Sequence, residues 1–237
     1  VLANLRGLAA QIPNQGVLIN RIVLQEARLS SAIENIFTTH DELLRADADA
    51  AAKTDPHPKQ ALTHRQSLNF GFRQLKERPL STNLFIDIVR TIKQVDLGVR
   101  RVPNTALKNA LNEVVYTPPV GEAVIREKLA NLEQFIHLQD DLDPLVKMAV
   151  IHYQFEAIHP FEDGNGRTGR IVNLLYLVEQ GLLDIPVLFL SRYIIANKPG
   201  YYEGLRGVTE RQDWESWILY MLRAVESTAQ QTFDQVT

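Results

Sequence analysis

The 237-residue sequence contains no cysteine and no long run of apolar residues, and both absences narrow what the protein can be. Without cysteine there is no disulfide framework, no thiolate nucleophile and no cysteine-ligated zinc site, so any metal must be bound by histidine or carboxylate side chains. The most apolar stretch, residues 171–178, is interrupted by Asn173 and ended by Glu179, far short of the roughly 18 to 20 apolar residues of a membrane span. We therefore expect no transmembrane helix and no membrane partner.

An excess of positive charge is also missing. Lysine and arginine total 25 against 28 acidic residues, a formal net charge of −3, so a nucleic acid is not expected as a partner. The first residues lack a basic region followed by a long apolar segment, so we expect no secretory signal, and a cytoplasmic location fits the missing cysteine. The sequence begins with Val1 rather than Met, as a piece cut from a longer protein would.

Hydrophobic residues make up 45% of the sequence, which is enough to form a buried core. In three segments they recur at the three- and four-residue spacing of amphipathic helices that pack on a common core. The three sets are Leu84, Ile88, Ile92 and Val95; Ile125, Leu129, Leu132 and Ile136; and Trp214, Trp217, Ile218, Met221 and Val225. Asp143 before Pro144 and Asp213 before Trp214 are typical N-caps and indicate two helix starts.

Two regions do not fit a helical pattern. Residues 47–59, an acidic Ala/Asp run that continues into a proline-rich stretch, predict a fraying helix end and an extended surface connection. Residues 98–119 contain Val-Pro-Asn at 102–104 and Val-Val-Tyr at 114–116, which suggests a short β-hairpin, or flap, between two helices. The pattern as a whole predicts an all-α fold with this one β-element.

Residues 155–177 contain side chains that packing alone does not explain. Pro160 disfavours helical geometry in the residue before it, so the preceding helix is expected to end at His159. Residues 163–166 read Asp-Gly-Asn-Gly, which suits a tight turn, and a helical run follows at residues 167–177. A helix N-terminus behind such a turn directs backbone N–H groups and the positive end of the helix dipole at one point, which favours binding of an anion.

Arg167 and Arg170 lie three positions apart in the first turn of this helix and offer two guanidinium groups suited to phosphate oxygens. Residues 164–169 also match the dinucleotide-binding pattern G-x-G-x-x-G. That pattern requires a preceding β-strand, whereas here a helix and a His-Pro step precede it. We therefore reject a Rossmann-type site and expect a phosphate-binding turn with His159 and Asp163 at its rim.

The segment from His159 to Arg170 resembles the signature of a known family. It reads H-P-F-E-D-G-N-G-R-T-G-R and matches in full the Fic signature H-P-F-x-[DE]-G-N-G-R-x-x-R. Residues 30–35 fit the pattern [ST]-x-x-x-E-[GN] of the inhibitory helix that some Fic proteins carry at the N-terminus. The chain thus resembles Fic (filamentation induced by cAMP) protein adenylyltransferases of that class, which implies an all-α Fic-type helical bundle with a short β-hairpin flap.

The resemblance also implies how the chain is organised. Residues 1–80 would form an N-terminal helical region, with the inhibitory helix at about residues 22–37, packed on a Fic catalytic core at residues 81–230. Both parts are expected to form one compact unit. The flap, at about residues 102–116, would align a segment of the target protein by strand-like pairing. Relatives suggest a homodimer, and the protein itself is one of the expected targets.

For the chemistry, the resemblance implies transfer of AMP from ATP to a Ser, Thr or Tyr hydroxyl of a target protein, with Mg²⁺ as cofactor. His159 would take the proton from the attacking hydroxyl, because a neutral imidazole is a suitable general base near neutral pH. Asp163 would hold Mg²⁺, an ion that binds through one or two carboxylates and the phosphates of its substrate.

The phosphates of ATP would lie over the turn and the first helical residues. Asn165 and the N–H groups around it are expected to bind the α-phosphate, Arg167 the β-phosphate and Arg170 the γ-phosphate. Tyr202 would border the adenine. The complete set of expected ATP-binding residues is Gly164, Asn165, Gly166, Arg167, Thr168, Gly169, Arg170 and Tyr202.

Ser30 and Glu34 complete the expected site. They lie one helical turn apart, and in relatives the glutamate at the position of Glu34 pairs with the second arginine of the signature, here Arg170. A carboxylate in the place of the γ-phosphate would either block ATP or misplace its α-phosphate. The resemblance therefore implies an autoinhibited enzyme.

Two alternatives remain open. Other Fic proteins transfer UMP, phosphate or phosphocholine, and some remove AMP with a glutamate that positions water, a role open to Glu34. The second alternative is a catalytically idle module that senses ATP. Its sequence sign would be loss of His159 or Asp163, and both are present.

Overall fold

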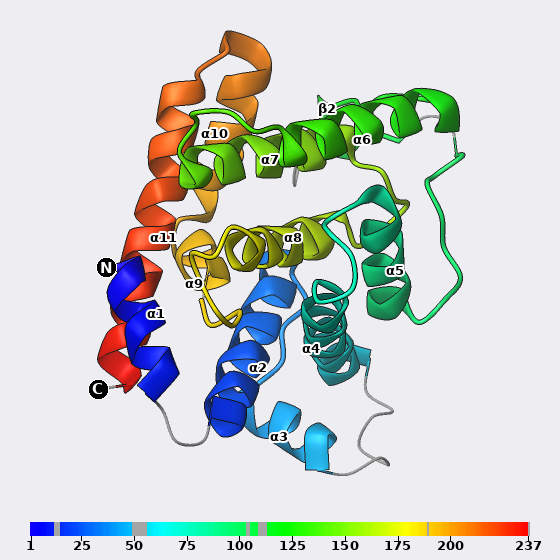
Figure 1. Cartoon of the computed structure of the whole chain (residues 1–237). Helices are drawn as coiled ribbons and strands as arrows, with labels where there is room; N and C mark the ends of the chain where they lie inside the picture. The colour runs from blue at the N-terminus through cyan, green and yellow to red at the C-terminus, as the bar shows by residue number, and fades with distance from the viewer. Residues whose placement is uncertain (12–14, 49–55, 103–104, 109–112, 189, 237) are drawn as a thin grey trace.

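The computed structural model describes residues 1–11, 15–48, 56–102, 105–108, 113–188 and 190–236; within these ranges only the backbone is described for residues 8–11, 15–20, 108 and 236. Within these ranges the chain forms eleven helices and two short strands (Figure 1). The helices are α1 (Leu2–Gln11), α2 (Gln15–Ile33), α3 (His40–Ala48), α4 (Pro56–Gln74), α5 (Thr82–Lys93), α6 (Glu122–His137), α7 (Pro144–Ile158), α8 (Asn165–Glu179), α9 (Leu190–Ala196), α10 (Lys198–Arg211) and α11 (Trp214–Val236). The strands are β1 (Leu107–Lys108) and β2 (Val114–Tyr116), and the predicted all-α bundle with a short β-element is confirmed.

Helix α8 runs through the middle of the molecule (Figure 1). It packs against α7 on one side and against α2, α4 and α5 on others. Every residue from Arg167 to Leu177 is buried. A helix that is enclosed on all sides belongs to the core, and the helices that surround α8 hold its first turn in a fixed position.

Helices α5 and α6 follow the predicted amphipathic pattern, with one exception. The three predicted core residues within α5 are buried: Leu84, Ile88 and Ile92. All four predicted positions of α6 are buried as well. The prediction for Val95 is wrong: α5 ends at Lys93, Gln94 adopts a left-handed φ of 57°, and Val95 is 52% exposed because the chain has already turned away from the helix axis.

The structure also differs from the extended connection predicted at residues 47–59. Helix α3 continues to Ala48, and α4 already begins at Pro56, so residues 56–59 form the first turn of a helix. Proline is well tolerated there because the first N–H groups of a helix have no partner within it. The prolines therefore mark a helix start, while residues 49–55 lie outside the described part of the chain.

Three predicted helix ends are confirmed. At the start of α7, the carboxylate of Asp143 accepts the N–H of Leu145 at 2.8 Å. At the start of α11, Asp213 accepts the N–H of Ser216 at 3.2 Å. Helix α7 ends at Ile158 with His159 as its C-cap, as the following proline predicts.

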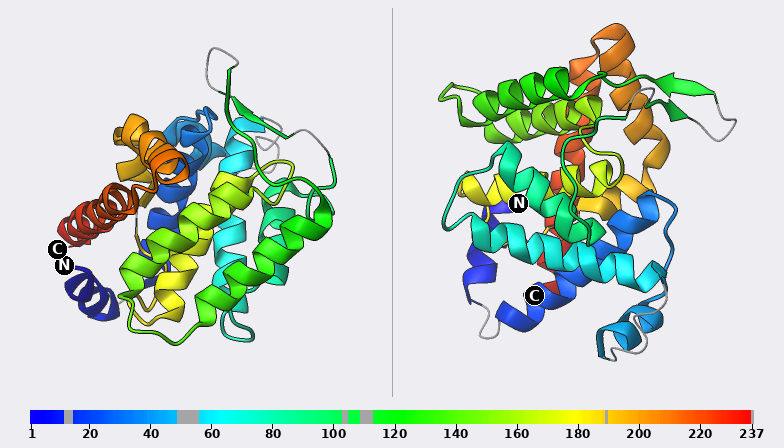
Figure 2. Two further views of the ribbon diagram at one scale, coloured as in Figure 1. Left: turned by 90° about the horizontal axis from the view of Figure 1, so that it is seen from above. Right: turned by 90° about the vertical axis from the view of Figure 1, so that its right-hand side faces the viewer.

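The two strands pair antiparallel, with Leu107 opposite Tyr116, and extend outward from the body of the molecule (Figure 2). The Tyr116 hydroxyl donates a hydrogen bond to the carbonyl of Ala157 at 2.8 Å, which ties the base of the flap to the last turn of α7. Val114 and Val115 are exposed on β2. The remaining predicted flap residues, 103–104 and 109–112, lie outside the described residues.

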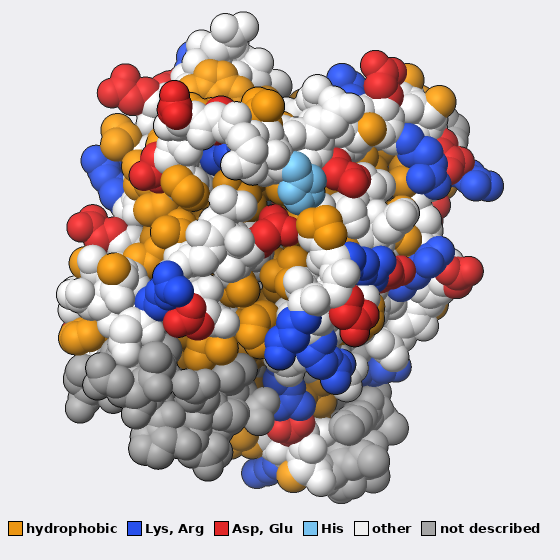
Figure 3. All heavy atoms as spheres, in the orientation of Figure 1, with side chains coloured by type: hydrophobic (Ala, Val, Ile, Leu, Met, Phe, Trp, Pro, Cys, Tyr) orange, Lys and Arg blue, Asp and Glu red, His pale blue; other side chains and the backbone are white. Residues whose placement is uncertain are grey.

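Charged side chains are interspersed on the surface. On the face shown in Figure 3, acidic groups lie among the basic ones, without a field of one sign over the whole face. Among the helices that the structure describes, none combines the length and the apolar character needed to cross a bilayer.

Candidate functional site

His159 occupies the C-cap of α7, where the helix gives way to the loop before α8. Its φ of 48° lies in the left-handed region, while its N–H still donates to the carbonyl of Phe155 at 3.0 Å. Arg100 secures this turn: its Nε donates to the carbonyl of His159 at 2.7 Å, and its backbone N–H donates to the carbonyl of Pro160 at 2.9 Å. The backbone on both sides of the histidine is thereby fixed.

The ring of His159 is in its neutral form near pH 7. Burial is the main cause, and the positive charge of Arg100 adds to it, so that the pKa of His159 falls to about 4. The Glu156 carbonyl and the carboxylates of Glu34 and Asp163 oppose this shift without cancelling it. A neutral imidazole has a lone pair free to accept a proton, which is the requirement for a general base.

The side chain of Asn165 shapes the loop between His159 and α8. Its Oδ1 accepts the N–H of Phe161 at 2.8 Å, and its Nδ2 donates to the carbonyl of the same residue at 2.8 Å. Asn165 is 2% exposed, and the Phe161 ring is fully buried in the core. Both ends of the amide are used within the loop, so Asn165 fixes the shape of the turn. One hydrogen of its Nδ2 is left over, and the expected contact with the α-phosphate stays a prediction.

The N-terminus of α8 offers backbone donors. The helix begins at Asn165, two residues earlier than predicted, and Gly164 is its N-cap with a φ of 83°. Glycine suits this left-handed conformation, and a Cβ at this position would lie 3.3 Å from Cγ2 of Val89. The first N–H groups of α8 have no partner within the helix, so they and the helix dipole favour an anion in front of Gly164.

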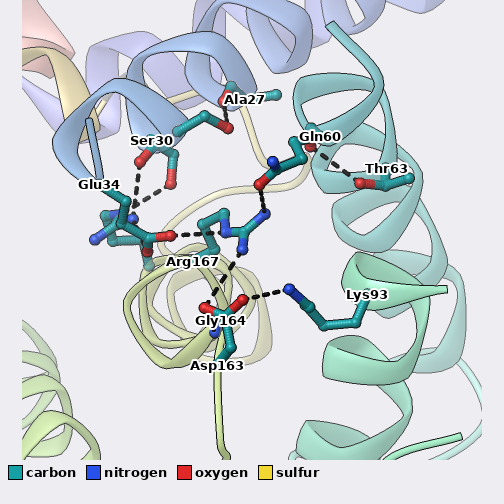
Figure 4. Close-up of polar contacts among 11 residues, drawn as sticks. Ala27, Ser30, Glu34, Gln60, Thr63, Lys93, Asp163, Gly164 and Arg167 are labelled. Atoms are coloured by element: carbon teal, nitrogen blue, oxygen red, sulfur yellow. Dashed lines mark hydrogen bonds and ion pairs between the residues drawn. The ribbon is translucent and has the colours of Figure 1, made fainter. Parts of the chain in front are cut away.

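Asp163 lies at the rim of this turn. One carboxylate oxygen pairs with the ammonium of Lys93 from α5, and the other accepts the N–H of Gly164 at 2.6 Å (Figure 4). Partial burial opposes ionisation, but Lys93 and the guanidinium of Arg167 together hold the pKa of Asp163 below its usual value. The carboxylate is therefore charged, and its side chain is 59% exposed.

A single accessible carboxylate is compatible with Mg²⁺. Over the described ranges, no group of three or more His, Asp or Glu side chains could hold a metal ion by itself. Mg²⁺ is commonly bound by one or two carboxylates, with water and substrate phosphates as the remaining ligands. Asp163 meets that requirement once Lys93 releases its oxygen.

Two buried arginines of α8 share one carboxylate from a distant part of the chain. Arg167 is 1% exposed and Arg170 is 2% exposed. Glu34 places Oε2 at 2.8 Å from Nε of Arg167 and Oε1 at 2.9 Å from Nη2 of Arg170 (Figure 4). The ion pair expected between Glu34 and Arg170 is present. The ion pair with Arg167 is an addition that the sequence pattern does not predict.

Ser30 supplies two further acceptors to Arg170. Its Oγ accepts a hydrogen bond from Nε at 2.8 Å, and its carbonyl accepts one from Nη2 at 2.9 Å. Helix α2 ends at Ile33, earlier than the predicted residue 37, because Asn35 adopts a left-handed φ of 62°. The carbonyls of a last helical turn lack partners within the helix, so this early end leaves the Ser30 carbonyl available to the guanidinium and places Glu34 just beyond it.

Gly166 and Gly169 leave room for two carboxyl groups against α8. A Cβ at Gly166 would lie 2.8 Å from Oε1 of Glu34 and 2.8 Å from Nη1 of Arg170. A Cβ at Gly169 would lie 2.7 Å from Oε1 of Glu156. All three distances are shorter than van der Waals contact, so packed side chains, rather than unusual backbone angles, explain glycine at these two positions.

Thr168 and Tyr202 differ in how they relate to the site. Thr168 is fully buried, so its side chain faces the core and not the open end of the helix. Tyr202 is 50% exposed, whereas the neighbouring Tyr201 is buried and its hydroxyl lies 2.8 Å from Nε2 of His152. Of the two tyrosines, Tyr202 is therefore the one available to a ligand.

Three side chains at the site are not predicted from sequence. Lys93 pairs with Asp163, Arg100 binds the His159 carbonyl, and Gln60 of α4 accepts a hydrogen bond from Nη1 of Arg167 at 3.1 Å. All three come from segments outside the signature. Their residue types carry no local pattern. The packing of α4 and α5 around α8 brings Gln60 and Lys93 to the site, and the segment that follows α5 brings Arg100.

Known proteins match this chain in both halves. A profile of the Fic/DOC family N-terminal region matches residues 1–73, and a profile of the Fic/DOC family matches residues 79–177. The chain belongs to the Fic/DOC family. A solved Fic domain containing signaling protein from Bacteroides thetaiotaomicron VPI-5482 has the same fold, with a TM-score of 0.79 and 20% identity over 98% of this chain and 92% of that chain.

Relatives of this Fic/DOC chain carry more specific names. A probable protein adenylyltransferase of Aquifex aeolicus is 36% identical over 81 residues, 34% of this chain and 25% of that protein. A protein adenylyltransferase of Caenorhabditis briggsae is 28% identical over 114 residues, 47% of this chain and 21% of that protein. A uridine 5'-monophosphate transferase of Xanthomonas campestris is 29% identical over 97 residues, 38% of this chain and 17% of that protein. The aligned segments thus span a quarter or less of these relatives.

Proposed function

We propose that the chain transfers AMP from ATP to a Ser, Thr or Tyr hydroxyl of a target protein, and that Glu34 holds this activity low. In the proposed reaction the hydroxyl oxygen bonds to the α-phosphorus, and the bond from that phosphorus to the bridging oxygen breaks. Pyrophosphate leaves, and the hydroxyl proton passes to His159. The neutral ring of His159, kept unprotonated by burial, suits this role.

The triphosphate would bind along the first turn of α8. Free N–H groups at the helix start would hold the α-phosphate, with Arg167 at the β-phosphate and Arg170 at the γ-phosphate. Tyr202, half exposed on α10, would border the adenine. Asp163 would hold Mg²⁺, which when bound neutralises part of the phosphate charge.

The observation that carries the proposal is the position of the Glu34 carboxylate. It touches both arginines that would otherwise receive the β- and γ-phosphates, at 2.8 and 2.9 Å. A carboxylate and a phosphate cannot occupy the same guanidinium face, so ATP must displace Glu34 or bind in a shifted position. Glu34 is thus proposed as an inhibitor built into the chain, and Ser30 as the residue that holds Arg170 toward it.

The test compares Glu34→Gly with the unchanged chain, using ATP labelled in either the α- or the γ-phosphate. We expect Glu34→Gly to label itself or lysate proteins from α-labelled ATP only, and Glu34→Gly/His159→Ala to lose the label. Asn35→Gly is the matched control, since Asn35 has a left-handed φ of 62° that glycine accepts and the substitution leaves the carboxylate in place. Equal labelling of the Glu34→Gly protein with and without His159 would contradict the proposal.

Transfer of UMP is the second candidate, favoured by the similarity to a uridine 5'-monophosphate transferase. Incubation of Glu34→Gly protein with ATP, UTP and CDP-choline, followed by intact-mass measurement, distinguishes added AMP, UMP, phosphate and phosphocholine. Removal of AMP is tested by adding the unchanged chain to modified target. An ATP-sensing module without catalysis is indicated if ATP raises the melting temperature while no mass is added in any variant.

The target protein is proposed to dock on the flap. Strand β2 is short, and its Val114 and Val115 side chains are exposed. An extended segment of a target could pair with such a strand through main-chain hydrogen bonds, which reads backbone shape more than side-chain identity. The target hydroxyl would then be held near α7, to whose last turn Tyr116 ties the flap.

A further inference from the structure

Glu156 is a second carboxyl group at the site, and neither the signature nor the proposed mechanism uses it. It lies in the last turn of α7, three residues before His159. Its Oε1 is buried and has no hydrogen-bond partner among the described residues. The same oxygen packs against Gly169 of α8, next to Arg170. An unpartnered buried carboxyl oxygen is costly, so its position within the electrostatic reach of the Arg170 guanidinium needs an explanation.

The groups around Glu156 come from three neighbouring elements. Arg170 of α8 acts on it with positive charge, and Glu34 at the end of α2 with negative charge. From α10, Tyr201 and Tyr202 also interact electrostatically with Glu156. Burial raises the pKa of Glu156 to about 7; Arg170 partly offsets this rise, and Glu34 adds to it. With Glu34 in place, the Glu156 carboxyl is therefore partly protonated at neutral pH.

Arg170 depends on Glu34 for its charge balance in this structure. Its hydrogen bonds in the described structure go to the Ser30 hydroxyl, the Ser30 carbonyl and the Glu34 carboxylate, and of these only Glu34 is charged. When Glu34 leaves, a buried guanidinium remains with two neutral acceptors. Such a cation favours ionisation of a carboxyl group on which its charge acts. Glu156 is such a group, and because it belongs to α7 it does not leave with the end of α2.

We propose that Glu156 is a positioning residue for Arg170. When Glu34 withdraws, Glu156 becomes the carboxylate partner of the Arg170 guanidinium, and it releases the guanidinium to the phosphate of an incoming nucleotide. This inference rests on the proposed nucleotide site. Once Glu34 has withdrawn, Glu156 loses its proton, because the carboxylate of Glu34 no longer repels the negative charge of Glu156. When a triphosphate reaches Arg170, the new negative charge returns a proton to Glu156. Nucleotide binding and proton uptake are then linked, and affinity for ATP falls as the pH rises through the pKa of Glu156.

The test measures ATP binding to Glu34→Gly protein by calorimetry between pH 6 and pH 8.5, with Mg²⁺ held constant. We expect the Kd to rise with pH by up to about tenfold per pH unit in part of this range, since each binding event takes up a fraction of a proton. In Glu34→Gly/Glu156→Gln the Kd is expected to be nearly independent of pH. The amide cannot ionise and keeps the size of the side chain, so a purely structural role would leave the two pH profiles parallel.

The comparison of the two proteins also controls for Glu26, another buried carboxyl group with a pKa of about 7. Glu26 also feels the charge of Arg170, but it is bonded to Ser191 and is retained in both proteins, so the difference between them isolates Glu156. Should Glu156→Gln fail to fold, calorimetry of Glu34→Gly/Glu26→Gln in two buffers of different ionisation enthalpy still decides the matter, because Glu26 can then take up no proton. Proton uptake beyond that of ATP and Mg²⁺ alone supports the proposal, and its absence overturns it.

The outcomes separate this inference from the proposed function. If Glu34→Gly binds ATP and modifies protein, but its pH profile is unchanged by Glu156→Gln, only the role of Glu156 is wrong. If it binds ATP with the expected proton uptake and never adds a group to any protein, the transfer reaction is wrong and the role of Glu156 stands. If it binds no ATP at any pH, both are wrong.

Discussion

Oε1 of Glu34 accepts a hydrogen bond from Nη2 of Arg170 at 2.9 Å, although 136 positions separate the two residues in the sequence. Arg170 comes from the core helix α8, and Glu34 from the turn that ends α2. The contact therefore joins the part of the chain that carries the family signature to the N-terminal part. Substitutions in α2 that change the position of Glu34 are therefore expected to change this contact.

Removal of the Ser30 hydroxyl should weaken inhibition. Nε of Arg170 donates to this hydroxyl at 2.8 Å, and loss of a hydrogen bond to a charged group costs about 1.5 to 3 kcal/mol. Ser30→Ala should therefore raise self-modification about tenfold, to a level at or below that of Glu34→Gly. Ser31→Ala is the control, because Ser31 is equally buried but its hydroxyl donates to the Ala27 carbonyl of its own helix. Equal effects of the two variants would show that general loosening of α2, and not Arg170, is responsible.

The acid limb of the pH–rate profile should lie far below the ordinary range of histidine. Burial and Arg100 lower the pKa of His159 to about 4, and the proposed mechanism requires the unprotonated ring. The kcat/KM of Glu34→Gly protein should thus show no loss from protonation of His159 until the pH approaches 4, since this ratio reports the free enzyme. Initial rates in overlapping buffers measure this. A decline with a midpoint near 6.5 would mean that the ring is exposed before ATP binds.

Asp163→Asn should raise the Mg²⁺ requirement. The amide oxygen can still accept the N–H of Gly164, so the turn is kept while the charged ligand is lost. We expect the Mg²⁺ concentration for half-maximal activity of Glu34→Gly protein to increase at least about tenfold. Glu162→Gln, a change at the exposed neighbouring position, should leave it unchanged. A Mg²⁺ titration that is identical for both variants would remove Asp163 from the metal site.

Glu26→Gln should stabilise the protein above neutral pH. Glu26 is 1% exposed, and burial raises its pKa from 4.5 to about 7, although the hydrogen bonds from Ser191 partly oppose this. Because the folded state holds the proton more tightly, the associated stability is complete below pH 4.5 and is lost as the pH rises to about 7. The loss amounts to at most about 3 kcal/mol.

Urea denaturation at pH 5 and pH 8 measures this effect. At pH 5 the glutamine variant and the unchanged chain should be similarly stable, because protonated Glu26 is already uncharged. At pH 8 the variant should unfold at higher urea. A variant that is less stable at both values would mean that the carboxylate, and not its protonated form, is the better partner for Ser191.

Local rules predicted those parts of the site that neighbouring residues determine. The end of α7 at His159 follows from Pro160, and the buried face of α6 follows from its apolar spacing. The same rules failed where one residue type serves two structures. Pro56 fits an extended connection as well as a first helical turn, and the structure has the helical turn. The loop contacts of Asn165 with Phe161 were not predicted, because turn residues are recognised by type and not by their partners.

Contacts between distant segments were predicted only where the family resemblance supplied them. The pairing of Glu34 with Arg170 was expected on that basis, but the simultaneous contact with Arg167 depends on where α2 ends. Lys93 could not be anticipated, since a lysine at the end of an amphipathic helix usually faces solvent. Its pairing with Asp163 results from the way α5 packs beside the first turn of α8.

The carboxylate of Glu34, which is proposed to inhibit the enzyme, is part of the chain, so its local concentration does not change when the protein is diluted. A tethered group of this kind competes at an effective concentration that is fixed by geometry, commonly millimolar or higher. A difference of about 1.4 kcal/mol changes the outcome of a competition tenfold. A small loss of the free energy that keeps the end of α2 in place therefore favours binding of the nucleotide over binding of Glu34. A partner that loosens the end of α2 by that amount would act as an activator without touching the site itself.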